Sequence, residues 1–278
     1  MISVLKMDLY RLFKSKLFYI ILIIFIILSV LSAVITDATI HTSTIDTKID
    51  STEKNSVVII DGSNMSEYSA DYANKTDYIC DVFSGNVVPM TMIIFSVLFA
   101  GAFRRTKYEK NIVCSVKKRW YFIVSNAIIS LMVCVLVVLI MLGVSALSNT
   151  LIISEYADLP FGSILKLSLF AVSYCALLVC VTYMTSCFIR FCKNHTIGLI
   201  VALVYGSGFV YGIINLILAP LLGSDFKIEA FLPLGTMYSL SVNMPDSTFY
   251  NAIVIALIFG ILSIVIDLIA SNKKDILC

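Results

Sequence analysis

The apolar residues of this chain fall into six long runs separated by polar segments. The runs lie at about 17–35, 87–103, 121–147, 163–189, 197–222 and 249–270. An α-helix rises about 1.5 Å per residue, so runs of this length are long enough to cross a hydrocarbon layer of about 30 Å. We therefore predict an all-α integral membrane protein with six transmembrane helices.

Composition agrees with this class. Hydrophobic residues make up 59% of the chain and charged residues 14%, and the mean hydropathy is +0.97. These values lie outside the range of globular proteins, and lipid would solvate most of the apolar surface. The first run is followed by no small-residue cleavage site, which indicates a membrane anchor and not a signal peptide.

The distribution of basic residues predicts the topology. Fifteen of the 20 Lys and Arg residues lie in segments 1–16, 104–120, 190–196 and 271–278, and the segment 104–120 alone holds seven. Loops rich in Lys and Arg stay on the cytosolic side of a membrane. We therefore expect both termini in the cytosol of a multi-pass protein of the cell membrane. The net charge of +2 hides this asymmetry and gives no indication of nucleic-acid binding.

The first 16 residues predict a short amphipathic helix before the first span. Apolar side chains fall within an arc of about 100° on one side of residues 2–15. They are Ile2, Leu5, Leu9, Leu12 and Phe13. The other side carries Lys6, Tyr10, Arg11 and Lys14. This pattern favours an interfacial helix in the cytosolic leaflet, and the alternative is a basic flank that only orients the first span.

One polar segment, 36–86, is long enough to form structure outside the membrane. It is rich in Ser, Thr, Asp and Asn, and a turn signal at Asp61-Gly62 follows a strand-like run at 56–60. The segment predicts either a small extracellular cap or an irregular extracellular loop.

Motifs for catalysis or metal binding are mostly absent. The chain has no GxxxxGK[ST] phosphate loop, which excludes ATP binding by that route. No two of its eight cysteines have CxxC spacing, and only Cys80 lies on the outer side, so we predict no metal site. Both histidines, His41 and His195, lie outside the predicted spans.

Few polar residues lie within the spans. Asp267 is near the cytosolic end of the sixth span, where it can pair with Lys273 or Arg190, and Asn215 in the fifth span can bond across a helix interface. Such residues are functional candidates in a membrane, although positions near the span ends favour structural roles. No series of carboxylates crosses the bilayer, so a transporter of this kind needs another source of energy.

Glycines in the fifth span predict close helix packing. They are Gly206, Gly208 and Gly212, of which the last two form a GxxxG pair. The stretch Tyr205 to Gly208 superficially resembles the serine motif of an intramembrane protease. It lacks the glycine two residues before the serine, and no span supplies a histidine, so packing is the better interpretation.

The chain resembles the permease subunits of ABC-2 type transporters. Three stretches carry the resemblance: the opening MDLYRLFKSKLFYIILI, the basic YEKNIVCSVKKRWYFIVSN, and FLPLGTMYSL between the last two spans. The resemblance covers essentially the whole chain and implies one permease domain, 1–278. It implies a cytosolic coupling helix within 104–120 and short re-entrant helices within 223–248.

The resemblance also implies an energy source, partners and a cargo. The chain would not be an enzyme itself, and two ATPase subunits holding ATP and Mg would push on it. The residues implied in coupling are Tyr108, Glu109, Asn111, Ile112 and Val113. Val113 and Cys114 replace the glycine and lysine that are common in the family. A second copy or a similar permease would pair through spans one and five.

The implied cargo is a small amphipathic or hydrophobic peptide, in toxin or antimicrobial peptide export or in self-immunity of a bacterium. Lipids and drugs are alternatives within the same family. A channel or a membrane scaffold without an ATPase is the alternative from another class.

Overall fold

The described residues of the protein are almost entirely helical. The computed structural model describes residues 2–50, 79–80, 82–83, 87–105, 120–152, 161–191, 195–210, 212–214, 217 and 231–273. No strand occurs among these residues. The all-α class predicted from the sequence is confirmed.

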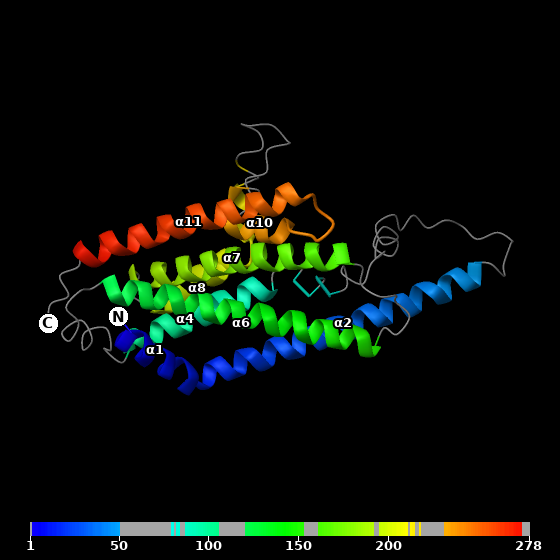
Figure 1. Cartoon of the computed structure of the whole chain (residues 1–278), viewed down its shortest axis with the longest axis horizontal. Helices are drawn as coiled ribbons and strands as arrows, with labels where there is room; N and C mark the ends of the chain where they lie inside the picture. Colours follow the sequence, from blue (N-terminus) through cyan, green and yellow to red (C-terminus); the bar gives the residue numbers. More distant parts are fainter. Residues whose placement is uncertain are drawn as a thin grey trace.

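Helix α1 (Ile2–Lys14) and helix α2 (Lys16–Asp50) are separated only by Ser15. The backbone stays hydrogen-bonded through the junction, because the amide of Ser15 donates to the carbonyl of Leu12 at 3.1 Å and that of Phe18 donates to Ser15 at 3.2 Å. Figure 1 shows α1 at an angle to α2 at one end of the molecule. Helix α2 continues beyond the predicted first span, so the segment expected as an external loop or cap is helical as far as Asp50.

The other long helices run lengthwise along the same bundle (Figure 1). They are α4 (Val87–Arg105), α6 (Trp120–Ile152), α7 (Phe161–Phe191) and α11 (Asp246–Lys273). Helix α7 is central, because it packs against α4, α6 and α11 as well as two shorter helices. We call the end of the bundle where α1 lies, α4 ends and α6 begins the terminal end. The opposite end is the far end.

Four helical segments are long and apolar enough to cross a membrane. They are Lys16–Ile35, Trp120–Ser148, Ile164–Ile189 and Asp246–Ile269. Two shorter apolar helices, Val87–Ala102 and Thr196–Gly206, stand where the second and fifth spans were predicted. The protein therefore has the character of a membrane-embedded helical bundle.

The fifth predicted span is interrupted. Helix α8 (His195–Gly206) ends at a turn at Ser207 and Gly208, after which helical residues resume at 209–210 and 212–214. Gly208 has a φ of 75°, in the left-handed region that glycine adopts without the steric cost of a Cβ. An uninterrupted helix over 197–222 is therefore the wrong expectation, because an apolar run fixes hydrophobicity but not backbone conformation.

Helix α10 (Pro233–Ser239) is hydrogen-bonded to the end of α8, where the fifth predicted span is interrupted. Pro233 occupies the first turn, where its missing amide costs no hydrogen bond. The phenol of Tyr238 donates to the carbonyl of Gly206 at 2.6 Å. Burial, and secondarily the phenol of Tyr205, raises the pKa of Tyr238 above its ordinary value. The predicted segment 223–248 thus contains one short helix among its described residues.

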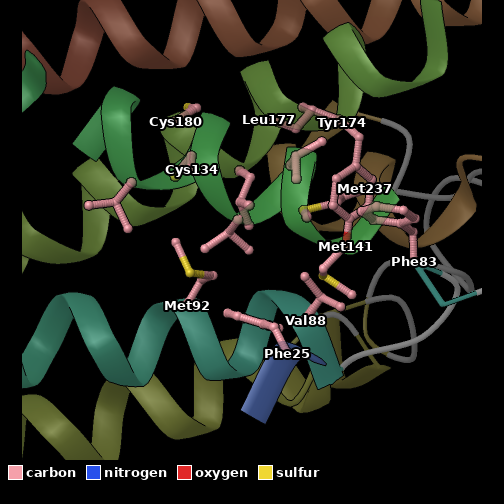
Figure 2. Packing of buried hydrophobic residues seen from close by; sticks show 14 of the residues in the cluster. Phe25, Phe83, Val88, Met92, Cys134, Met141, Tyr174, Leu177, Cys180 and Met237 are labelled. Carbon is pink, nitrogen blue, oxygen red and sulfur yellow. The ribbon is translucent and has the colours of Figure 1, made fainter. Parts of the chain in front are cut away.

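The far end of the bundle is held by an aromatic cluster of Phe83, Phe170, Tyr174 and Phe249. The ring of Phe170 lies 5.8 Å from Phe83, 5.7 Å from Tyr174 and 6.5 Å from Phe249, measured between centroids. Figure 2 shows Phe83 and Tyr174 grouped with Met141 and Met237. Ser145 Oγ donates to the carbonyl of Ile79 at 3.1 Å, which ties the short segment before α4 to α6.

Candidate functional site

A polar stretch of α7 lies in its half nearer the terminal end and carries the largest group of buried polar side chains that we find in the described helices. It comprises Thr182, Tyr183, Thr185, Ser186 and Cys187, all buried. Helical spacing of about 100° per residue places Thr182, Thr185 and Ser186 on one side. Tyr183 and Cys187, four residues apart, lie on another side. One helix therefore presents polar groups on two of its sides.

The first side of the polar stretch meets α4 at Ser96. The Ser96 hydroxyl donates to the carbonyl of Thr182 at 2.8 Å. Its oxygen also lies 3.0 Å from Thr185 Oγ1 and 2.6 Å from Ser186 Oγ. The exposed fraction of Ser96 is 5%, so these hydrogen bonds form away from solvent and join α4 to α7 at a single buried point.

Helix α6 reaches the same group through Cys134. Its sulfur lies 3.4 Å from Thr182 Oγ1, and Cys134 is fully buried. The hydroxyl of Thr182 also contacts the carbonyl of Leu178 in its own helix at 2.8 Å. Three helices, α4, α6 and α7, therefore converge on Thr182.

The second side of the polar stretch meets α11. The phenol of Tyr183 donates to a carboxylate oxygen of Asp267 at 3.0 Å, and Asp267 is only 3% exposed. Cys187 Sγ lies 3.9 Å from the carbonyl of Ser263, one turn away. The sequence predicted Asp267 as an intramembrane polar residue but did not identify Tyr183 as its partner. The side chains of Arg190 and Lys273, the partners suggested for it, lie outside the described residues.

A fourth polar contact joins α1 to α6. The carboxylate of Asp8 accepts a hydrogen bond from Ser125 Oγ at 2.7 Å, and both residues are 1% exposed. Asp8 lies between Val4 and Leu12 in the stripe of α1 that packs on α6. Sequence reasoning missed this contact. The available signal was that Asp8 is the single acid in a basic helix and shares a face with apolar residues four positions away on either side.

The chemistry of these groups is that of hydrogen bonding between helices. The hydroxyls donate to backbone carbonyls or to one another, and those of Ser125 and Tyr183 donate to carboxylates. The described residues also contain no group of three or more His, Cys, Asp and Glu side chains placed to hold a metal ion. These contacts join α1 to α6, α4 and α6 to α7, and α7 to α11.

The structure places the predicted glycines in three different settings. A Cβ on Gly206 would lie 3.1 Å from Ile93 Cδ1, so α8 closely approaches α4 at this position. Gly208 carries the positive φ of the turn. A Cβ on Gly212 would meet no described atom within 4 Å, so Gly212 does not pack closely against another described helix of this chain.

The predicted coupling residues and one intramembrane candidate are not placed. Tyr108, Glu109, Asn111, Ile112 and Val113 lie outside the described residues, and so does Asn215. The structure does place the ends that flank the coupling segment. Arg105 ends α4 and Trp120 begins α6, both at the terminal end (Figure 1).

No protein-family model matches this sequence, and no curated protein matches it significantly.

Ser96 gives a direct test of the polar stretch. Replacing Ser96 with alanine removes the interhelical hydrogen bonds and should lower the free energy of unfolding by about 1–2 kcal/mol, since such bonds in membranes contribute about 0.6 kcal/mol each on average. Reversible unfolding in mixed micelles measures the change. Thr91→Ala is the matched control, because Thr91 lies on the same helix and its hydroxyl bonds only the carbonyls of Val87 and Val88. Equal effects of the two substitutions would contradict the role assigned to Ser96.

Proposed function

We propose that this chain is the membrane-spanning permease subunit of an ABC-2 type transporter that exports small amphipathic or hydrophobic peptides. A separate ATPase, with ATP and Mg, would supply the energy. The observation that carries the proposal is the order of the elements. A short amphipathic helix turns at Ser15 into the first long apolar helix, and a short helix, α10, stands between the interrupted α8 and α11. A basic segment lies between α4 and α6.

The polar contacts suggest how a push at 104–120 would spread through the bundle. The segment connects the end of α4 to the start of α6. Ser96 joins α4 to α7, Cys134 joins α6 to α7, and Ser125 joins α6 to α1. A displacement of the segment would therefore move α4 and α6 together with α7 rather than bend a single loop. In this proposal the polar residues position helices and do not contact cargo.

The apolar outer faces of the bundle suit both lipid and a second permease. Helix α2 exposes Ile23 and Ile27 at 55% and 58%, and α8 exposes Ile200 and Val204 at 54% and 42%. These are the two helices expected to pair in a dimer. A second copy or a similar permease would cover part of these faces and lipid the rest. The scarcity of charged residues within the apolar runs also favours hydrophobic or amphipathic cargo over sugars or ions.

Two other functions remain alternatives. Lipids or drugs would suit the same apolar surfaces within the same transporter class. A channel or scaffold without an ATPase would use the bundle as a rigid body, for which the interhelical hydrogen bonds are equally suitable.

A pull-down from the native membrane separates these functions. The tagged full chain is purified in mild detergent, and bound proteins are identified by mass spectrometry. The permease proposal predicts a soluble protein with a phosphate loop, GxxxxGK[ST], at a ratio near one per permease chain. Washing at high salt should leave it bound if apolar side chains carry the contact. A preparation that contains no nucleotide-binding partner would reject the permease proposal and favour a channel or scaffold.

A further inference from the structure

Helix α1 is oriented by the face that it buries. Val4, Asp8 and Leu12 form a stripe at a spacing of four residues, and they are 6%, 1% and 2% exposed. This stripe packs on α6, and the hydrogen bond from Ser125 to Asp8 fixes its rotation about the helix axis. The sequence predicted Phe13 among the apolar residues opposite the lysines. In the structure Phe13 is 49% exposed instead. Only the stripe of Val4, Asp8 and Leu12 is buried against α6, and this stripe is narrower than the predicted apolar face of α1.

The opposite side of α1 combines positive charge with exposed aromatic rings. We call this side the basic face; it consists of Lys6, Met7, Tyr10, Phe13 and Lys14, with Lys16 just beyond at the start of α2. The only acid among residues 2–16 is Asp8, which is buried and hydrogen-bonded. The exposed charges of the helix are therefore all positive. Tyr10, at 65% exposed, lies beside Lys14, whose Nζ is 5.6 Å from the centroid of the ring.

The basic face continues into a surface suited to hydrocarbon. On α2 the side chains of Tyr19, Ile20 and Ile23 are 50%, 56% and 55% exposed, and they belong to a helix long and apolar enough to span a membrane. The transition from lysines and aromatic rings to isoleucines occurs within about two turns. Aromatic rings and long basic side chains prefer the level of the lipid headgroups, between hydrocarbon and water.

We propose that the basic face of α1 binds the headgroup phosphates of anionic phospholipids in the adjoining leaflet. Lys6, Lys14 and Lys16 supply the charge, while Met7, Tyr10 and Phe13 enter the boundary between headgroups and acyl chains. A soluble protein partner fits less well, because it would have to cover Phe13 and Tyr10 while leaving Ile20 and Ile23 in lipid. The proposal depends on the membrane character of the chain and not on transport, so it can fail or succeed independently of the permease function.

Trp120 is the reporter for the test. It is the only tryptophan of the chain, is 41% exposed, and begins α6 five residues before Ser125, the partner of Asp8. The full chain is reconstituted into bilayers that contain phosphatidylglycerol and phosphatidylcholine, with either one or the other carrying brominated acyl chains. Quenching of Trp120 by each brominated lipid gives the relative affinity of the neighbouring surface for the anionic lipid.

The expected result is stronger quenching by phosphatidylglycerol at low salt. Substituting Lys6, Lys14 and Lys16 together with glutamine should lower the relative affinity at least about fivefold, the factor expected for even one surface lysine. Raising the salt to about 1 M should have a similar effect by screening.

Two control variants and two contrary results make the test decisive. The triple substitution of the same lysines with arginine should retain the preference, because it keeps the charge. Lys166→Gln is the matched control, since Lys166 is exposed on α7 toward the far end and its loss should change nothing. Equal quenching by both lipids in the unaltered chain would overturn the proposal. An unchanged preference in the triple glutamine variant would also overturn it, because the basic segment 104–119 would then account for the enrichment.

Discussion

Replacing Ile112 with aspartate should abolish binding of the proposed ATPase subunit, and with it the proposed export, while the chain inserts into the membrane normally. Ile112 and Val113 are adjacent apolar residues in a segment that holds seven Lys and Arg residues. An apolar pair in so basic a segment suits a groove on a partner. A carboxylate in such a groove loses its hydration without gaining a partner, which should weaken binding at least about a hundredfold. The positive-inside bias depends on Lys and Arg, so the topology should not change.

The measurement compares the amount of ATPase that copurifies with each variant at equal membrane expression. Ser115→Asp is the matched control, because it adds the same charge to the same segment at a polar position and should leave most of the binding intact. Ile112→Leu should also retain binding, since it keeps the apolar volume. Full export by the Ile112→Asp variant would reject this residue as a docking contact.

Replacing Phe170 with alanine should lower the free energy of unfolding by about 3–5 kcal/mol, the usual cost of deleting a large buried aromatic side chain. Phe170 is 1% exposed, and its ring contacts those of Phe83, Tyr174 and Phe249. These residues come from the segment before α4, from α7 and from α11. The substitution leaves a cavity where three parts of the chain meet. The substitution lowers the free energy of unfolding in a membrane as well, because side chains that line the cavity lose packing contacts that lipid cannot restore.

Val172→Ala is the matched control for this second prediction. Val172 lies two residues from Phe170 on the same helix but is 60% exposed, so its truncation should cost less than about 1 kcal/mol. Reversible unfolding in mixed micelles, followed by circular dichroism, measures both variants. A change of under 1 kcal/mol for Phe170→Ala would show that the aromatic cluster does not stabilise the far end of the bundle.

Local patterns along the chain predicted the helices well where a long apolar run was enough to specify a helix. The runs near 17–35, 121–147, 163–189 and 249–270 became helices long and apolar enough to span a membrane. The amphipathic helix before the first span also formed, over Ile2–Lys14. Apolar runs of this length have few alternatives, because backbone groups in lipid must bond within their own helix. The same logic did not reveal the turn at Gly208, since glycine is tolerated in a continuous helix as well as in a break.

The candidate site was predicted only in part, for a different physical reason. Asp267 stood out because a carboxylate is rare within an apolar run. Its partner Tyr183 is 84 positions away, and Ser96 is 86 positions from the carbonyl that it bonds. Serine and threonine hydroxyls can bond carbonyls of their own helix, so their residue type gives no signal of a contact between helices.

The sequence by itself determined the class of the protein, the positions of its long apolar helices and the uneven distribution of its basic residues, because these follow from local hydrophobicity and from charge. Only the tertiary structure decided which faces meet. It placed Asp8 against Ser125, gathered Ser96, Cys134 and Thr182 at one point, and left the lysines of α1 exposed. The physical reason is that an apolar helix has similar hydrophobicity all round in a membrane. Its rotation is therefore fixed by packing and by a few buried hydrogen bonds to other helices.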